Sequence, residues 1–281
     1  MSRFDISSIE AGLNTYIVGK SGKNEFWDEI VSTNDRAIEL AREGAPEGVI
    51  VIARQQSAGR GRQGRSWVSP KDAGIFISII LRPVIDMSSL PLISFAGGVA
   101  AAQAIESVTA VRIGLKWVND LVYEGKKLGG ILAEVPGSQE PAKHSKDGWM
   151  LPSAVIIGFG INLCMPTDNL PEELKERVVS LDEINGRAVN ANQLASELCN
   201  FFEEQYNNLR YNAGEIVLND WKSWSVTLGK RVKASCGNEK WEGTATGITE
   251  SGALLLQTED GKEHILHAGE LSIRLEDGRY A

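Results

Sequence analysis

The stretch GVIVIARQQSAGRGRQGRSW, residues 48–67, carries the strongest structural signal in this chain. Its first part, 48–54, is an almost unbroken apolar run, which is typical of a strand buried on both faces. Its last part, 59–67, intersperses three glycines with three arginines and closes on Trp67. Glycines let backbone N–H groups curl around an anion, and guanidinium groups match carboxylate or phosphate. The stretch therefore predicts a buried strand that leads into an anion-binding loop.

Further strands and helices are expected on both sides of this loop. Apolar runs predict strands at 26–32, 74–81, 112–118, 121–127, 128–135 and 154–163. Helical spacing predicts helices at 35–42, 90–108, 170–181, 191–211 and 216–224. The polar residues 136–152 predict a surface insertion.

The character of the chain changes at Leu228. From there, short alternating segments are separated by turns such as Asp260-Gly261, which predicts a small barrel-like β domain. We therefore expect a large domain at 1–227, whose first 25 residues form a short leading segment, and a small domain at 228–281.

Composition narrows the class of protein. A net charge of −8 argues against broad nucleic-acid binding. The three cysteines, Cys164, Cys199 and Cys236, are widely spaced and indicate neither a disulfide framework nor a zinc site. No apolar run is expected to reach the ~20 residues of a membrane span. These features are typical of a cytoplasmic protein with no membrane partner.

Five motifs occur in series: STN at 32–34, GRGRQGRSW at 59–67, KWVND at 116–120, KLGGIL at 127–132 and GFGIN at 158–162. Together with the trailing β domain they resemble biotin protein ligases, also called biotin–[acetyl-CoA-carboxylase] ligases. The resemblance implies an α+β fold: a mixed sheet with helices on one side, of the class II synthetase-like kind, and a C-terminal SH3-like β-barrel. It also implies two reaction steps. Biotin and MgATP form biotinyl-5′-AMP, and a lysine of a biotin carboxyl carrier protein or domain then receives the biotin.

The resemblance implies roles for individual residues as well. Lys116, Arg62 and Arg60 are the expected catalytic cations, because biotin carboxylate and ATP phosphate bring negative charge into one small volume. The expected biotin-binding residues are Ser32, Thr33, Asn34, Gln56, Gly59, Arg60, Lys116, Gly129, Gly130, Gly158 and Gly160. The expected nucleotide-binding residues are Arg62, Arg65, Trp67, Asn119, Lys127, Asn162, Glu270 and Arg274.

Several of these assignments have a structural alternative. Mg²⁺ is expected to arrive with ATP, and Asp120 is a candidate ligand because Mg²⁺ prefers oxygen. A purely structural role is equally compatible with Asp120 and is the better explanation of Asn119. Ser32 and Thr33 also suit the cap of a helix, and Trp67 suits either an adenine contact or a cap on the loop.

Two further alternatives stay open. Gln55 precedes Gln56, so either glutamine can be the one that contacts biotin. Glu270 and Arg274 share one face of a strand, where they fit an exposed ion pair as well as a nucleotide contact.

Two other functions are compatible with parts of the sequence. A lipoate ligase or octanoyl transferase shares the catalytic fold but lacks the arginine–glycine loop. A non-catalytic biotin sensor has no need of Arg62 and Lys116, which are both present. Only about 25 residues precede the first strand, so we expect no winged helix-turn-helix and no operator DNA as a partner. Homodimerisation stays open.

Overall fold

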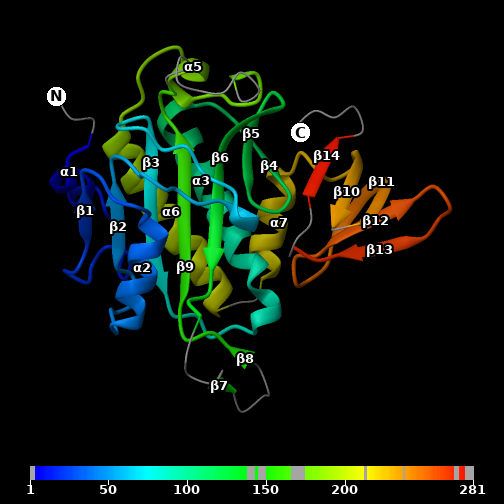
Figure 1. The fold of residues 1–281 in the computed structure, drawn as a ribbon, viewed down its shortest axis with the longest axis horizontal. Helices are drawn as coiled ribbons and strands as arrows, with labels where there is room; N and C mark the ends of the chain where they lie inside the picture. Colours follow the sequence, from blue (N-terminus) through cyan, green and yellow to red (C-terminus); the bar gives the residue numbers. More distant parts are fainter. Residues whose placement is uncertain are drawn as a thin grey trace.

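The buried strand predicted at 48–54 is β2 (Ile50–Ala53), and it is buried along its whole length. It belongs to a seven-stranded sheet of the order β1-β2-β3-β9-β6-β5-β4 (Figure 1). The other members are β1 (Glu25–Trp27), β3 (Gly74–Leu81), β9 (Val155–Asn162), β6 (Lys126–Glu134), β5 (Asp120–Tyr123) and β4 (Gly114–Lys116). β1 is parallel to β2, and the remaining neighbours are antiparallel. The predicted mixed sheet is confirmed.

The computed structural model describes residues 4–137, 143–144, 150–165, 175–211, 214–236, 238–268 and 272–275. Most of the insertion expected at 136–152 lies outside these residues. Its described part includes β7 (Lys143–His144), which pairs with β8 (Met150–Leu151).

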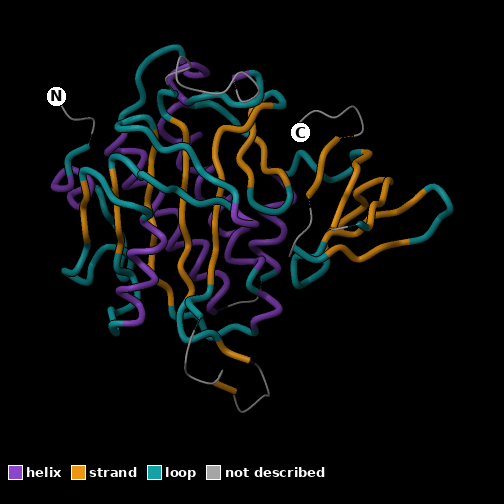
Figure 2. Tube along the Cα trace, in the orientation of Figure 1, coloured by secondary structure: helices purple, strands orange, loops and turns teal. Residues whose placement is uncertain are grey.

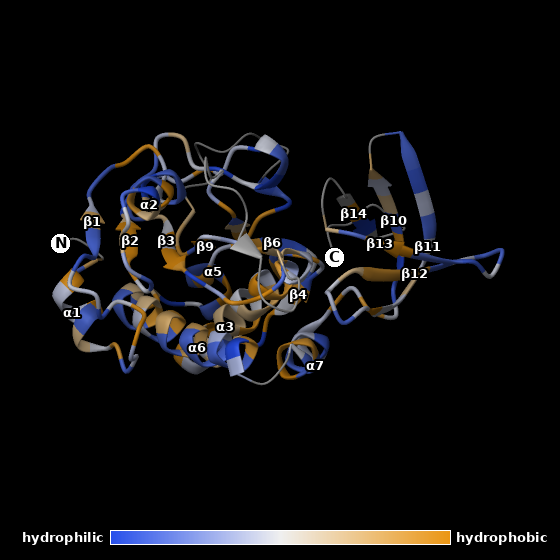
Figure 3. Cartoon of the chain, turned by 90° about the horizontal axis from the view of Figure 1, so that it is seen from below, coloured by the Kyte–Doolittle hydropathy of each residue, from blue (hydrophilic) through white to orange (hydrophobic). Residues whose placement is uncertain are grey.

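The main helices cover one face of the sheet, as predicted. They are α3 (Pro91–Thr109), α6 (Ala191–Tyr211) and α7 (Glu215–Trp224), and Figure 3 shows them on the same side of the strands. α2 (Thr33–Arg42) packs in addition on the opposite face. Strand alternation explains both layers, because Ile50 and Ile52 face the large core, whereas Val51 faces Ala37 of α2. Shorter helices are α1 (Ile6–Ala11), α5 (Leu181–Asn185), η1 (Arg62–Gly64) and η2 (Met87–Ser89).

The segment Met87–Thr109 corrects the expectation that no segment is long and apolar enough for a membrane span. It has the length and the apolar composition of a membrane span, but 67% of its most apolar window is buried inside the protein. Glycines and alanines make up much of α3, and the helix packs closely against α6. It is therefore a core helix of this fold.

The small β domain predicted after Leu228 is a five-stranded antiparallel sheet of the order β13-β12-β11-β10-β14. Its strands are β10 (Arg231–Cys236), β11 (Glu239–Ile248), β12 (Leu254–Thr258), β13 (Glu263–Leu266) and β14 (Ser272–Leu275). Figure 2 shows it beside the end of the large sheet that carries β4. Val232 and Leu254 of this sheet belong to the same hydrophobic core as Phe95 of α3.

Some predicted elements differ from the structure; the strand expected at 112–118, for example, is only Gly114–Lys116. The strand expected at 26–32 is shorter, because β1 ends at Trp27. Of the helix expected at 170–181, residues 170–174 lie outside the described residues; Lys175 is helical, but the helix does not continue to 181. Val179 N–H donates to Lys127 O at 3.0 Å, and Lys127 N–H donates to Arg177 O at 2.7 Å. These bonds hold 177–179 extended beside the start of β6, and α5 begins only at Leu181.

Candidate active site

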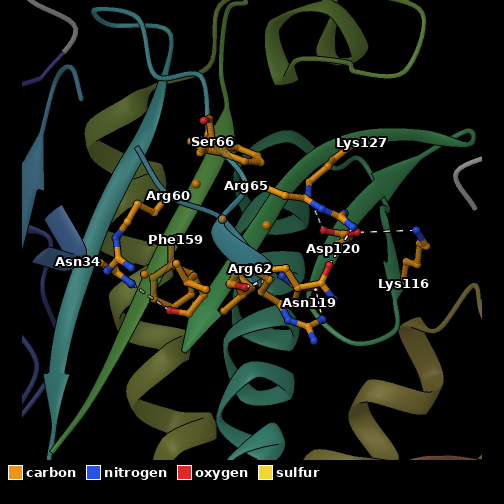
Figure 4. A pocket seen from close by; sticks show the side chains of 18 of the residues that line it. Asn34, Arg60, Arg62, Arg65, Ser66, Lys116, Asn119, Asp120, Lys127 and Phe159 are labelled. Atoms are coloured by element: carbon orange, nitrogen blue, oxygen red, sulfur yellow. Dashed lines mark hydrogen bonds and ion pairs between the residues drawn. The ribbon is translucent and has the colours of Figure 1, made fainter. Parts of the chain in front are cut away.

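A pocket gathers most of the predicted site residues (Figure 4). It is formed by the start of α2, the loop 59–67, the β4–β5–β6 region and the middle of β9, together with β14 of the small sheet. The predicted residues that line it are Ser32, Thr33, Asn34, Gln56, Arg60, Arg62, Arg65, Trp67, Lys116, Asn119, Asp120, Lys127, Gly130, Gly158, Gly160 and Arg274.

The loop 59–67 is held as a narrow turn by its own backbone. Trp67 N–H donates to Gly59 O at 2.8 Å, and Gly61 N–H donates to Arg65 O at 2.7 Å. A Cβ on Gly59 would lie 2.5 Å from Trp67 O. Only glycine therefore fits where the two ends of the loop meet.

Arg60 is paired with two carboxylates. Its Nη1 and Nη2 donate to Oε1 and Oε2 of Glu134, each at 2.8 Å. Nη2 also lies 2.7 Å from Asp35 Oδ1. Among the residues that the structure describes, the buried Nε of Arg60 has no acceptor. A buried donor without a partner is unfavourable, so an acceptor on a bound ligand would be stabilised there.

Arg62 and Arg65 lie in different surroundings. Arg62 donates from Nη1 to Asn119 Oδ1 at 3.3 Å and from Nη2 to the carbonyl oxygen of Ala268 in the small domain. Burial lowers the pKa of the Arg62 guanidinium, which marks a cation held away from water. Arg65 is exposed and donates to Gln63 Oε1 at 2.9 Å.

Trp67 lies against β9 because that strand has no side chain at Gly160. A Cβ on Gly160 would come within 2.7 Å of Trp67 Cε2. The ammonium of Lys127 lies 5.1 Å from the centroid of the indole. Within the described part of the chain, the buried indole Nε1 has no acceptor. The tryptophan thus presents an unused donor at the pocket.

Two lysines meet at one carboxylate, as Figure 4 shows. Asp120 Oδ1 lies 2.6 Å from Lys127 Nζ, and Oδ2 lies 3.8 Å from Lys116 Nζ. Lys116 is only 4% exposed, and burial lowers its pKa to about 7. Asp120 opposes that shift, while the cations Arg274, Lys127 and Arg65 add to it. Lys116 therefore lies close to the point where it gains or loses its charge at neutral pH.

The start of α2 forms one side of the pocket. Ser32 is the N-cap, with its hydroxyl accepting from Asp35 N–H at 3.4 Å, as the capping alternative predicted. Thr33 N–H donates to Gln56 Oε1 at 2.9 Å. Gln56 lines the pocket, whereas Gln55 is not among the lining residues. The geometry favours Gln56 over its neighbour.

Asn34 is the polar centre of this side. Its Nδ2 donates to Glu134 Oε2 at 2.8 Å, and its Oδ1 lies 2.6 Å from Ser78 Oγ. A Cβ on Gly158 would come within 2.1 Å of the same Oδ1. The glycine is therefore required for Asn34 to lie across β9.

Three of the predicted residues that the structure describes are not among those that line the pocket. Gly59 lies at the base of the loop, and Gly129 lies inside the sheet. Asn162 is buried, and its Nδ2 donates to Val179 O at 3.1 Å. That bond joins the end of β9 to the segment that precedes α5. Glu270 lies outside the described residues.

Sequence reasoning missed other residues at the site. Three of them, Glu134, Asp35 and Ser78, do not line the pocket but bond to residues that do. The others line the pocket directly: Gly61, Gln63, Ser66, Trp117, Ile131, Leu132, Phe159 and Ile273. Ser78 is the one polar side chain in the apolar run of β3, and this was the signal that could have identified it.

Comparison with known proteins bears on this site. The model of the Biotin/lipoate A/B protein ligase family matches residues 28–145, and that of the Biotin protein ligase C terminal domain matches residues 227–274. The chain is 34% identical over 262 residues to the "Bifunctional ligase/repressor BirA" of Bacillus spizizenii, covering 93% of this chain and 77% of that protein. It is 32% identical to the "Biotin--[acetyl-CoA-carboxylase] ligase" of Mycobacterium tuberculosis, covering 85% of each.

A solved structure shows the same fold. It is the biotin protein ligase from Aquifex aeolicus in complex with biotin and ATP, with a TM-score of 0.74 and 28% identity. The match covers 90% of this chain and 99% of that one.

Proposed function

This chain belongs to the biotin protein ligase family, and from that premise we propose that it joins biotin and ATP into biotinyl-5′-AMP and transfers the biotinyl group to a lysine of a carrier domain. The observation that carries the proposal is the composition of the pocket. Four cations line it, Arg60, Arg62, Lys116 and Lys127, together with a hydrogen-bonding wall built from Thr33, Asn34 and Gln56. Asn34 of this wall lies beside Arg60, since both donate to the same oxygen of Glu134. Biotin has a polar ring, which needs hydrogen-bonding partners, and a carboxylate tail, which needs cations.

In the first step, an oxygen of the biotin carboxylate attacks the α-phosphorus of ATP, and pyrophosphate leaves. Both reactants are anions, so the protein has to supply positive charge and fixed donors around the reacting centre. We assign this task to Arg60 and Arg62 of the loop. The buried Nε of Arg60, which has no acceptor among the described residues, is a donor available to the ligand.

Lys116 and Lys127 supply the opposite side of the same centre. Asp120 lies between them and fixes Lys127 at 2.6 Å. An arriving phosphate would favour the charged form of Lys116, whose pKa is about 7 in the free protein. Ligand binding thus raises the protonated fraction of Lys116, and the ammonium of Lys127 lies 5.1 Å from the indole centroid of Trp67.

The nucleotide is assigned to the side of the pocket formed by Trp67, with Asn119 and Arg274 nearby. The indole offers an aromatic face and an Nε1 donor that has no acceptor in the described chain. Asn162 and Gly129 lie behind this wall, and we assign them supporting roles.

Mg²⁺ fits this pocket only as part of MgATP. The described residues contain no group of three or more His, Cys, Asp or Glu side chains that could hold a metal ion. Asp120 is the one carboxylate among the lining residues. Magnesium commonly binds through substrate phosphates with one or two carboxylates, and there it neutralises phosphate charge.

In the second step, the unprotonated amine of an acceptor lysine attacks the carbonyl carbon of the mixed anhydride. An amide bond forms, AMP leaves, and the amine releases a proton to solvent. The charged groups that stabilise the first step also stabilise the departing phosphate.

The test is incubation with biotin, ATP and Mg²⁺, followed by mass analysis for biotinyl-5′-AMP and pyrophosphate. Parallel reactions contain lipoate, or a biotin carboxyl carrier domain as acceptor. Adenylate with biotin and biotinylated acceptor are the expected results. Activation of lipoate in preference to biotin would indicate a lipoate ligase, and biotin binding without pyrophosphate release would indicate a sensor.

A further inference from the structure

Glu134, the last residue of β6, accepts hydrogen bonds from two residues of the pocket, Arg60 and Asn34. One oxygen, Oε2, accepts from both Arg60 Nη2 and Asn34 Nδ2, each at 2.8 Å. The other oxygen accepts from Arg60 Nη1 at 2.8 Å. A carboxylate can only accept hydrogen bonds, so it requires the NH₂ group of Asn34 to face it. The carbonyl oxygen of Leu132, 3.4 Å from the same Nδ2, requires the same orientation more weakly.

The orientation of the Asn34 amide determines which acceptors the hydroxyl groups of Ser78 and Thr33 donate to. With Nδ2 turned to Glu134, Asn34 Oδ1 faces Ser78 Oγ at 2.6 Å. An amide oxygen only accepts, so the single hydroxyl proton of Ser78 is used there. Ser78 Oγ also lies 2.8 Å from Thr33 Oγ1. This second contact is a hydrogen bond only if Thr33 donates it.

This series of hydrogen-bonded side chains, from Glu134 through Asn34, Ser78 and Thr33, ends at Gln56. The Thr33 hydroxyl also lies 3.1 Å from Gln56 Oε1, but its single proton goes to the nearer Ser78 Oγ. Gln56 Oε1 then receives only the backbone N–H of Thr33, at 2.9 Å. The orientation of the Gln56 amide is fixed by its nitrogen, since Nε2 donates to Ser69 Oγ at 2.9 Å. Ser69 Oγ in turn donates to Trp67 O at 3.2 Å. Gln56 Oε1, in the pocket wall, keeps capacity to accept from a ligand.

We propose that Glu134 is a positioning residue that sets the donor and acceptor pattern of the biotin pocket through Asn34, Ser78 and Thr33 to Gln56. The proposal rests on the function given above, since it takes the ring N–H groups of biotin as the donors that Gln56 receives. The same carboxylate places Arg60, so one side chain aligns the ring-binding wall with the cation that meets the acid group.

The test compares Glu134→Gln with Asp35→Asn. Glu134→Gln keeps the size of the side chain but can donate to Asn34, which removes the requirement on the amide. Asp35→Asn neutralises the other carboxylate on Arg60 and leaves the Asn34 bond in place. Biotin binding is measured by calorimetry, and the KM values for biotin and ATP are measured in adenylate formation. Ser78→Ala breaks the series without touching Arg60, and it keeps the test valid if Glu134→Gln folds poorly.

We expect Glu134→Gln and Ser78→Ala to weaken biotin binding about tenfold or more, because hydrogen bonds to charged or buried partners have effects of this size. Their KM for ATP should stay within about twofold of the native value, and Asp35→Asn should change biotin binding by less than about threefold. Native-like biotin binding in Glu134→Gln, or in Ser78→Ala, overturns the proposal. So does an equal loss in Asp35→Asn, since the effect would then be one of charge on Arg60. A native protein that forms no adenylate contradicts the proposed function instead.

Discussion

The absence of a Cβ atom at Gly160 determines how closely Trp67 can approach the sheet. The indole occupies the space that a side chain at position 160 would fill, with Cε2 within 2.7 Å of a Cβ built on Gly160. Packed interiors tolerate such overlap poorly, and relieving it typically requires a shift worth about 1–3 kcal/mol. Gly160→Ala should therefore displace the indole and raise the KM for ATP about tenfold.

Steady-state assays of pyrophosphate release measure this change. Gly98→Ala is the matched control, because its added Cβ meets nothing closer than 3.5 Å. A native KM for ATP in Gly160→Ala would show that the nucleotide does not depend on the position of Trp67.

The buried ammonium of Lys116 should make stability depend on pH. Burial lowers its pKa to about 7 from an ordinary 10.5, so between these values the unfolded chain binds more protons than the folded one. The free energy of unfolding must then rise with pH across that window, and the full penalty applies below pH 7. Lys116→Met removes the penalty and should be more stable at pH 7 by about 1–4 kcal/mol, while forming adenylate much more slowly.

Urea unfolding at several pH values between 7 and 10 measures this effect. The difference between the variant and the native protein should shrink as pH rises. Lys230→Met, at an exposed position, should show no such trend. A constant difference at every pH, or normal pyrophosphate release by Lys116→Met, contradicts the assignment.

At the level of helices and strands, regular apolar patterns could be predicted from the sequence, whereas pairings between distant segments could not. β3 and α6 match their predicted bounds because their apolar residues recur without interruption over the whole element. The segment 177–179 was misassigned because its extended form depends on hydrogen bonds to Lys127, fifty residues earlier. Local propensity carries no information about such a partner.

The same limit applies to the site. Arginines in a glycine-rich loop indicate an anion by their type and spacing alone. Glu134, Asp35 and Ser78 lie on three different elements, β6, α2 and β3, and their roles arise only when the fold brings these elements together. The bond from the Asn162 amide to Val179 O likewise could not be predicted from the motif, which indicated only a ligand contact for this residue.

The arginine loop connects the large sheet to the small domain through Arg62, which donates to Ala268 O and Asn119 Oδ1. Arg62→Gly removes both contacts and a cation from the pocket. The adenylate should still form but escape about tenfold or more faster, since hydrogen bonds from charged groups are typically worth about 1.5–3 kcal/mol. Released adenylate would acylate lysines of any protein nearby.

Mass spectrometry of an added unrelated protein measures this labelling. Arg187→Gly is the control, because Arg187 is exposed and is not among the residues that line the pocket. Equal retention of adenylate by Arg62→Gly and the native enzyme would argue against a retaining role for Arg62.

At the level of the whole molecule, the two sheets share one core. The boundary proposed at Thr227 is buried, and Thr227 Oγ1 accepts from Trp117 N–H at 2.9 Å. Trp117 Nε1 donates to Gly252 O at 3.0 Å. Val232 and Leu254 pack in the same core as Phe95. Arg274 can line the pocket only while these contacts hold the small sheet in place.

The chain should therefore unfold in one cooperative transition, with equal calorimetric and van't Hoff enthalpies. Trp117→Phe leaves the buried carbonyl of Gly252 without its donor and should lower the free energy of unfolding by about 1–3 kcal/mol while the single transition persists. Trp241→Phe, on a half-buried ring of β11, should change it less. Two resolved transitions in calorimetry, with the first removed by deleting 228–281, would mean that the small sheet folds independently. The position of Arg274 at the pocket would then depend on ligand binding, because a core that melts separately cannot hold that side chain in place.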